Sequence, residues 1–223
     1  MTPQAGPGTP SGAAFERICV VGAGLIGGSV ARRLVGLGVD VVVVDPDERT
    51  RSLAAASGLA VVESVPADRD LVVLSTPLDA LPEAMDEAAS RAPQAVIIDL
   101  GSVKQAPARA AVAAGLSGRY VGVHPMAGTE HTGFEHSDPD LLVGASWAVV
   151  HGAAESPLVQ VVAWVLEAFE ATVVVVGAAE HDRSVALVSH APHAVAHALL
   201  AGAETSPDVA VARWLAAGSF RDG

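Results

Sequence analysis

The sequence predicts an α/β protein with a Rossmann-like, doubly wound and mostly parallel sheet, followed by the start of a C-terminal helical domain that is truncated. Three observations predict this fold. Short apolar runs alternate with helical stretches from residue 17 onward, the first run enters a glycine-rich turn, and the runs stop after Gly177. We therefore divide the chain into a disordered tail (1–16), an α/β domain (17–177) and a partial helical domain (178–223).

Composition supports a globular core and excludes several functions. Of the 223 residues, 51% are hydrophobic and only 4% are aromatic, so the predicted core consists of alanine, valine and leucine. The net charge of −12 argues against binding to nucleic-acid phosphates. Cys19 is the only cysteine and lies in an apolar run, so we expect a reduced, buried thiol.

The N-terminal stretch, residues 1–14, is rich in proline, glycine, serine and threonine and has no basic residue. This composition fits neither a signal peptide nor a transit peptide. No uninterrupted apolar run approaches the ~20 residues that a membrane-spanning helix needs. We therefore expect a soluble, cytoplasmic protein with no membrane partner.

The glycine turn follows a predicted strand at 17–21 and precedes a predicted helix at 29–37. Gly22 permits a tight turn, Gly24 lets a pyrophosphate approach the backbone, and Gly27 permits close packing of helix on strand. A GxGxxG pattern in this context predicts a dinucleotide site. The turn residues that we expect to bind the cofactor are Gly22, Gly24, Leu25, Ile26 and Gly27.

The second predicted strand, at 39–44, ends in Asp45, ~20 residues after the glycine turn, where ribose-binding carboxylates occur. A carboxylate there accepts hydrogen bonds from a ribose diol and repels a 2′-phosphate, so we favour NAD over NADP. The alternative is that Asp45 only caps a helix that begins at Asp47. Arg49 and Arg51 lie nearby and leave the choice of cofactor open to a 2′-phosphate.

The remaining elements continue the alternation of strands and helices. Ser75, Thr76 and Pro77 end a strand and begin a helix, and strand ends of this kind face the cofactor in doubly wound sheets. Further strands are predicted at 60–62, 71–75, 95–100, 146–150 and 172–176, and helices at 48–57, 105–114, 157–168, 180–203 and 207–217.

Three polar clusters lie at predicted element ends: Ser102 with Lys104, His124 with Thr129 and Glu130, and Ser189 with His190 and His193. The first two follow successive strands, so they can converge on the cofactor crevice. This arrangement suits oxidation of a substrate hydroxyl, in which a neutral histidine accepts the proton while nicotinamide accepts the hydride.

His124 is the predicted proton acceptor, placed in the loop after a short apolar run at 120–121. The alternative is a histidine at a strand end that only satisfies its own hydrogen bonds. Ser102 can orient the imidazole or contact the hydroxyl, and it can also cap the helix from Gln105.

A metal site is the alternative use of His190, His193 and His197, whose spacing places them on one helical face. No carboxylate completes a recognised zinc signature, and Pro192 disturbs the helix between the first two. We therefore expect no metal. His181, His151 and His136 are interpreted as surface or loop histidines.

With these residues in place, the chain resembles the prephenate/arogenate dehydrogenase family of tyrosine biosynthesis. The resemblance extends over nearly all of 17–223, and its most particular motifs are His-Pro-Met-Ala-Gly (124–128) and Ser-His-Ala-Pro-His (189–193). The other matching segments are 21–29, 99–104, Gly133 and 144–147.

The resemblance implies NAD-linked oxidation and decarboxylation of prephenate to 4-hydroxyphenylpyruvate by a homodimer when the protein is complete. It implies that His124 is hydrogen-bonded to the ring hydroxyl and that Ser102 assists it. It also implies that the substrate pocket includes Thr129, Glu130, His190 and His193.

The chain departs from the family pattern at its C-terminal end. Family members continue past the segment that resembles 218–222 to a carboxylate-binding arginine, which Arg221 does not match, so we expect a truncated chain. Three alternatives stay open: arogenate or an aminated prephenate analogue as substrate, a dinucleotide-binding module without catalysis, and a generic hydroxyacid dehydrogenase.

Overall fold

The computed structural model describes residues 15–151 and 155–216. The predicted tail, apart from its last two residues, and Arg221 lie outside these ranges. The strands are β1 (Arg17–Val21), β2 (Asp40–Val44), β3 (Ala60–Val61), β4 (Leu71–Leu74), β5 (Val96–Asp99), β6 (Tyr120–Pro125), β7 (Ser146–Val150) and β8 (Thr172–Val176). The helices are α1 (Leu25–Gly36), α2 (Glu48–Ala56), α3 (Leu81–Arg91), α4 (Gln105–Ala113), the 3₁₀ turn Phe134–His136, α5 (Glu155–Phe169), α6 (Ala178–Val185), the π-helical turn Ala186–His190, α7 (Ala191–Glu204) and α8 (Val209–Leu215).

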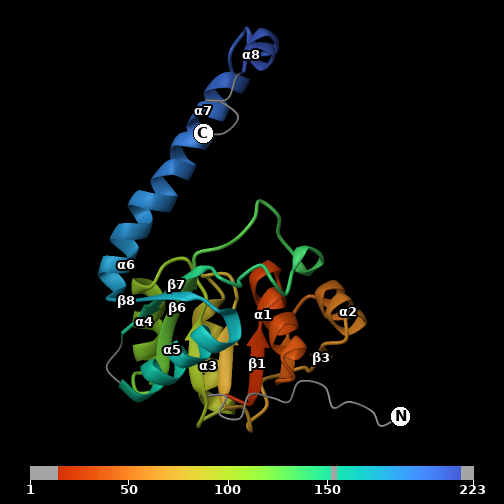
Figure 1. Cartoon of the computed structure of the whole chain (residues 1–223), viewed down its shortest axis with the longest axis vertical. Coiled ribbons are helices and arrows are strands. Elements are labelled where there is room, and N and C mark those ends of the chain that lie inside the picture. Colours follow the sequence, from red (N-terminus) through yellow and green to blue (C-terminus); the bar gives the residue numbers. More distant parts are fainter. Residues whose placement is uncertain (1–14, 152–154, 217–223) are drawn as a thin grey trace. The chain divides into compact units, whose positions relative to one another are not determined.

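The strands form one sheet in the order β3-β2-β1-β4-β5-β6-β7-β8 (Figure 1). All neighbouring pairs are parallel except β6 with β7. The order reverses between β1 and β4, which is where doubly wound sheets open a crevice at the carboxyl ends of their strands. The predicted Rossmann-like sheet is confirmed.

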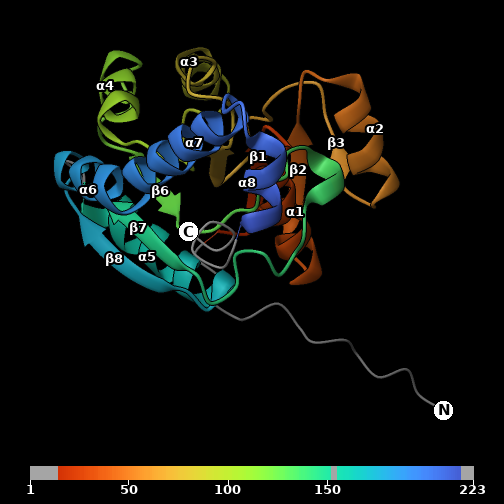
Figure 2. The same ribbon diagram turned by 90° about the horizontal axis from the view of Figure 1, so that it is seen from above.

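The sheet is buried on both faces because its central strands are continuous apolar runs. Ile18 and Val20 pack with α1 and α5 on one face, whereas Cys19 and Val21 pack with α3 and α4 on the other. Figure 2 shows these two helical layers on opposite sides of the sheet. The strand ends are therefore the part of the sheet where polar side chains can gather.

Cys19 is fully buried and makes no disulfide, as predicted. Burial raises the pKa of the Cys19 thiol to about 12. A thiol with so high a pKa carries almost no thiolate at neutral pH and is chemically inert.

Three predicted boundaries were wrong. The helix after the glycine turn begins at Leu25 instead of residue 29, because the turn residues themselves enter the first helical turn. α3 begins at Leu81, with Pro82 in its first turn, so Pro77 does not start it. β6 extends to Pro125, so His124 lies within the strand and not in the loop after it.

The glycine turn joins β1 to α1 at very short range. Gly22 has φ 88°, a left-handed conformation that favours glycine. A Cβ on Gly27 would lie 1.9 Å from the Gly22 carbonyl oxygen, so only glycine fits there. This contact fixes the N-terminus of α1 against the end of β1.

The contacts within the chain divide it into two units, Met1–His181 and Asp182–Gly223. The predicted boundary at 177/178 lies a few residues earlier and stays a prediction. The predicted single helix at 180–203 is interrupted by a π-helical turn, Ala186–His190, directly before α7. Pro192 explains the interruption, since proline has no N–H and its ring clashes with the carbonyl four residues earlier in a regular helix.

The stretch Ala178–Glu204 spans 27 residues with a mean hydropathy of 1.2 in its most apolar window. By length and composition alone, it is long and apolar enough to cross a membrane, although no single uninterrupted apolar run marks it in the sequence. Its exposed apolar side chains include Leu187, Val188, Val195, Leu199 and Leu200.

We predict that Gly27→Ala destabilises the protein. Alanine in a helix gains about 1 kcal/mol over glycine, but the clash with the Gly22 carbonyl costs more, so we expect a net loss of about 2 kcal/mol or more in the free energy of unfolding. Urea denaturation measures this loss. Gly36→Ala, in the same helix and with open space around its Cβ, is the control. Equal stability of the two variants would contradict the prediction.

Candidate active site

The glycine turn opens onto a cavity of about 580 Å³ at the carboxyl ends of β1, β2 and β4. This cavity brings together every predicted cofactor residue except Gly27, whose part is the packing of α1 on β1. Its lining consists of Gly22, Gly24, Leu25, Ile26, Asp45, Pro46, Ser75, Thr76, Pro77, Ala80, His131, Thr132 and Gly133.

Gly24 is the N-cap of α1, and a Cβ placed on it would have no atom within 4 Å. Gly24 thus differs from Gly22 and Gly27, because at those two positions close contacts inside the protein exclude any larger residue. The space next to Gly24 lies at a helix N-terminus, where unpaired backbone N–H groups and the helix dipole favour an anion. A phosphate group fits this position.

Thr76 carries a buried hydroxyl with no hydrogen-bond partner among the described residues. Buried polar atoms in folded proteins nearly always have a partner, so an orphaned hydroxyl in a cavity wall indicates a bound polar group. Thr76 lines both this cavity and a second one beside it. A dinucleotide that runs along the strand ends would supply the missing partner.

Asp45 is held in place by two backbone amides. Its Oδ2 accepts from Ala23 N at 2.7 Å, and its Oδ1 accepts from Asp47 N at 2.9 Å. A carboxylate accepts about four hydrogen bonds, so it can still bind a ribose diol. The alternative role as a helix cap belongs to Asp47 instead, whose side chain accepts from Thr50 N at 2.7 Å.

Both nearby arginines have partners within the protein. Arg49 pairs with Glu135 at 2.9 Å, and Arg51 donates to the carbonyls of Asp45 and Pro46 at 2.9 and 2.7 Å. The second cavity, of about 660 Å³, is lined by Asp45 and Arg51 together with the acidic residues Glu63, Glu83 and Glu87. Excess negative charge there opposes a 2′-phosphate.

His124 lies near the carboxyl end of β6 and contacts a second histidine. Its Nδ1 is 3.0 Å from His181 Nε2, and the two rings meet edge to face with centroids 5.2 Å apart. His181 is only 3% exposed, so its interpretation as a surface or loop histidine was wrong. The spacing of 57 residues between the two gives no local sequence signal, which is why sequence reasoning missed the pair.

Ser102 lies at the end of the neighbouring strand, β5, in the loop that leads to α4. It is exposed, and the N-cap of α4 is Lys104 with no side-chain cap, so the alternative role of Ser102 as a cap was wrong. Because β5 and β6 are adjacent and parallel, Ser102 and His124 follow the same edge of the sheet. Its predicted role beside His124 stays a prediction.

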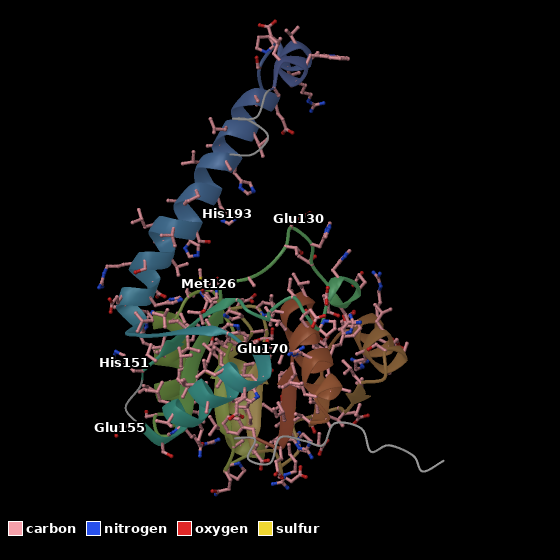
Figure 3. The ribbon with its side chains drawn as sticks, viewed as in Figure 1. Met126, Glu130, His151, Glu155, Glu170 and His193 are labelled. Atoms are coloured by element: carbon pink, nitrogen blue, oxygen red, sulfur yellow. The ribbon has the colours of Figure 1, made fainter. Side chains whose placement is uncertain are left out.

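Thr129 and Glu130 lie in the exposed loop after β6. Figure 3 shows Met126 at the base of this loop and Glu130 at its tip. Glu130 is 83% exposed and lies 3.5 Å from His131, whose ring stacks on His136. The predicted contact of Thr129 and Glu130 with substrate stays a prediction.

His190 and His193 belong to the second unit and are exposed. His193 Nδ1 lies 2.9 Å from the carbonyl of Ser189, and His197 Nδ1 lies 2.9 Å from the carbonyl of His193. Within residues 15–151 and 155–216, no three histidine, cysteine or acidic side chains are grouped as a metal site requires.

A buried ion pair lies beside His124 and was also missed by sequence reasoning. Lys104 Nζ is 2.5 Å from Asp99 Oδ1, and both side chains are fully buried. Tyr120 donates to Asp99 Oδ2 at 2.5 Å. Burial, followed by the Asp99 charge, raises the pKa of Tyr120 above its ordinary value. The available signal was that Lys104 is the only lysine and that Asp99 ends an apolar strand.

Two protein-family models match the chain. The model described as prephenate dehydrogenase, nucleotide-binding domain, matches residues 30–175, and the prephenate dehydrogenase dimerization domain matches residues 177–223.

Three relatives illustrate the similarity. Prephenate dehydrogenase of Lactococcus lactis is 27% identical over 93% of this chain and 60% of its own length. Cyclohexadienyl dehydrogenase of Zymomonas mobilis is 31% identical over 93% of this chain and 75% of its length. The crystal structure of Aquifex aeolicus prephenate dehydrogenase with hydroxyphenyl propionate and NAD+ matches with a TM-score of 0.83 and 28% identity, over 93% of this chain and 76% of that chain.

We predict that Gly24→Ala weakens dinucleotide binding without loss of stability. The new methyl group meets no protein atom, so the free energy of unfolding should change by less than about 0.5 kcal/mol. Because the methyl group occupies the space next to the α1 N-terminus, we expect the Kd for NAD to rise at least about tenfold, or about 1.4 kcal/mol. Calorimetric titration with NAD, with Gly36→Ala as control, measures this change. An unchanged Kd would remove Gly24 from the proposed phosphate site.

Proposed function

The chain belongs to the prephenate dehydrogenase family, and from this premise we propose that it catalyses the NAD-dependent oxidative decarboxylation of prephenate to 4-hydroxyphenylpyruvate in tyrosine biosynthesis. The observation that carries the proposal is an imidazole pair, His124 with His181, at the sheet edge that also holds the dinucleotide cavity. The chain spans 60% of the length of the Lactococcus relative, so activity of the complete gene product is the appropriate test.

NAD is the proposed cofactor. The open space at Gly24, the orphaned Thr76 hydroxyl and the anchored Asp45 carboxylate support a dinucleotide along the ends of β1, β2 and β4. The acidic wall of the second cavity and the engaged arginines support NAD over NADP. When bound, NAD supplies the acceptor for the hydride of the ring carbinol.

His124 is the proposed proton acceptor. In a hydrogen-bonded imidazole pair, one ring nitrogen donates and the other accepts. We assign the Nδ1–H of His124 as the donor to His181 Nε2, so that His124 Nε2 carries the lone pair. A neutral imidazole oriented through its other nitrogen is the arrangement that general-base catalysis requires. The substrate hydroxyl then passes its proton to His124 Nε2 as the carbinol becomes a carbonyl.

Loss of the ring carboxylate as carbon dioxide leaves an aromatic product, which makes the reaction effectively irreversible. We assign Ser102 to a hydrogen bond that assists His124 and His193 to the substrate pocket, with His190, Thr129 and Glu130 lining it. These assignments follow the family motifs at 99–104, 124–130 and 189–193.

A related substrate is the second candidate, and the name of the Zymomonas relative, cyclohexadienyl dehydrogenase, favours it. Arogenate or an aminated prephenate analogue differs from prephenate only in groups remote from the reacting hydroxyl. The same His124 chemistry therefore serves each of them. Parallel kcat/KM values for prephenate and arogenate, each with NAD and NADP, identify the preferred pair. A non-catalytic module would instead bind NAD in calorimetry and oxidise neither substrate.

A homodimer in the cytoplasm is the proposed assembly. The dimerization-domain model covers 177–223, and this segment exposes apolar side chains on α7 and α8. Trp214 is 89% exposed, and burial of such side chains against a second copy would remove apolar surface from water. The proposed cytoplasmic location follows from the proposed reaction, which draws on the cellular NAD pool.

We predict that His124→Asn in the complete protein lowers kcat for NADH formation from prephenate by about 100-fold, because asparagine cannot accept the proton. The Kd for NAD should change little, since the dinucleotide cavity is lined by other residues. Absorbance at the NADH band and calorimetry measure the two quantities. An unchanged kcat would refute the role of His124, and a wild-type protein that forms no NADH would refute the proposed reaction.

We predict that Val195→Glu together with Leu199→Glu converts the dimer to a monomer. These side chains are 59% and 58% exposed and lie one turn apart on α7. Sedimentation velocity measures the mass, and Val112→Glu, which charges a valine on α4 that is 65% exposed, is the control. A wild-type monomer would contradict the proposed dimer. Recovery of the protein with membranes would contradict the cytoplasmic location.

A further inference from the structure

We propose that the buried side chain of Lys104 is a positioning residue that holds His124 in its working place, an inference that rests on the function proposed above. Lys104 Nζ lies 2.7 Å from the carbonyl oxygen of Val123, the residue that precedes His124. The same ammonium group contacts the side chain of Asp99 at 2.5 Å and its carbonyl oxygen at 3.3 Å. One cation therefore joins the carboxyl ends of β5 and β6.

The hydrogen-bond ladder between β5 and β6 explains why a lysine is needed there. The ladder begins with Ile97 N donating to Arg119 O at 2.8 Å, and parallel ladders repeat every two residues. By this period, the donor for the Val123 carbonyl is the Gly101 amide. Gly101 N donates instead to Asp99 Oδ1 at 2.9 Å, because the chain turns away after β5. Lys104 thus supplies the donor that the ladder lacks next to His124.

Two glycines make room for this arrangement. A Cβ on Gly122 would lie 3.0 Å from Lys104 Cδ and 3.1 Å from the Tyr120 hydroxyl. A Cβ on Gly101 would lie 2.9 Å from Asp99 Oδ1. The lysine chain therefore passes along β6 where that strand has no side chain, and a larger residue at either position would displace the side chains of the ion pair.

Tyr120 completes the cluster from the first residue of β6. Its hydroxyl donates to Asp99 Oδ2, so both carboxylate oxygens of Asp99 are engaged. A buried and fully paired carboxylate is rigid, because any movement would leave charge without a partner. The hydrogen bond from Lys104 therefore holds the Val123 carbonyl in place, and the hydrogen bond from Gly101 to Asp99 holds the start of the loop that carries Ser102.

Three variants of the complete protein test the role of Lys104. Lys104→Met removes the donor to Val123, and Tyr120→Phe removes one hydroxyl while the ring stays. Arg69→Met is the control. Arg69 is also buried and paired, with Asp40 and Asp68, but it lies at the amino ends of the strands, away from His124. The readouts are the ¹⁵N chemical shifts of the His124 ring, identified with His124→Asn, together with kcat, KM and the Kd for NAD.

We expect Lys104→Met to shift the His124 ring signals and to lower kcat by about 100-fold, the size expected for a displacement of about 1 Å at a catalytic group. The Kd for NAD should stay within about twofold. Tyr120→Phe should shift the same signals and lower kcat by about three- to tenfold. Arg69→Met should lower thermal stability and leave the His124 signals and kcat unchanged.

A folded Lys104→Met protein with wild-type His124 signals and kcat would overturn the proposal. If Lys104→Met does not fold, Tyr120→Phe decides, and unchanged signals and kcat in that variant would overturn it equally. Displacement of the signals by Arg69→Met to the same extent would also overturn it. If the wild-type protein forms no NADH, the proposed function fails by itself, whereas the ring signals still decide whether Lys104 positions His124.

Discussion

The contact between α1 and the turn after β1 is the constraint on which the rest of the structure depends. Gly27 approaches the Gly22 carbonyl so closely that no other residue fits, and this contact presses the N-terminus of α1 against the end of β1. The Ala23 amide in the same turn holds Asp45 at the end of β2, so the proposed anion site and the proposed ribose site are joined by one hydrogen bond. A two-layered apolar core then keeps the other strand ends at the same edge.

At the carboxyl ends of the strands, the charged side chains differ in burial between the two halves of the sheet. Around β1 and β2, carboxylates and arginines remain partly in solvent, where polar ligands can exchange with water. Around β5 and β6, Asp99 and Lys104 are fully buried, and loss of one partner of such a pair costs about 3–5 kcal/mol. The half around β1 and β2 is thus accessible to solvent. The half that carries His124 rests on the buried ion pair of Asp99 and Lys104, which loses stability if either partner is replaced.

Much of the sheet and of the cavity beside the glycine turn could be predicted from the sequence, because both depend on local patterns. Apolar runs predicted the strands of the sheet except for most of β6, of which only residues 120–121 were expected, and the local GxGxxG pattern with Asp45 predicted residues that do line one cavity. Contacts between distant residues could not be predicted. His181 joins His124 across 57 positions, and Lys104 reaches Val123 through side-chain geometry that no periodicity records. The late start of α3 has the same origin, because a local proline signal does not reveal where the chain leaves the sheet.

The π-helical turn at Ala186–His190 has a consequence for how this chain can vary. A π turn holds one more residue than an α turn, and successive residues of a regular helix are separated by about 100° around the axis. Deletion of a single residue there would restore a regular helix with nearly the same azimuth of every later side chain, including His193, relative to Val185, because the π turn winds its extra residue into one turn. The π turn therefore lets the chain carry one residue more or less here while the Ser-His-Ala-Pro-His motif keeps its face of the helix, whereas the same residues wound as a regular helix would turn His193 by about 100°.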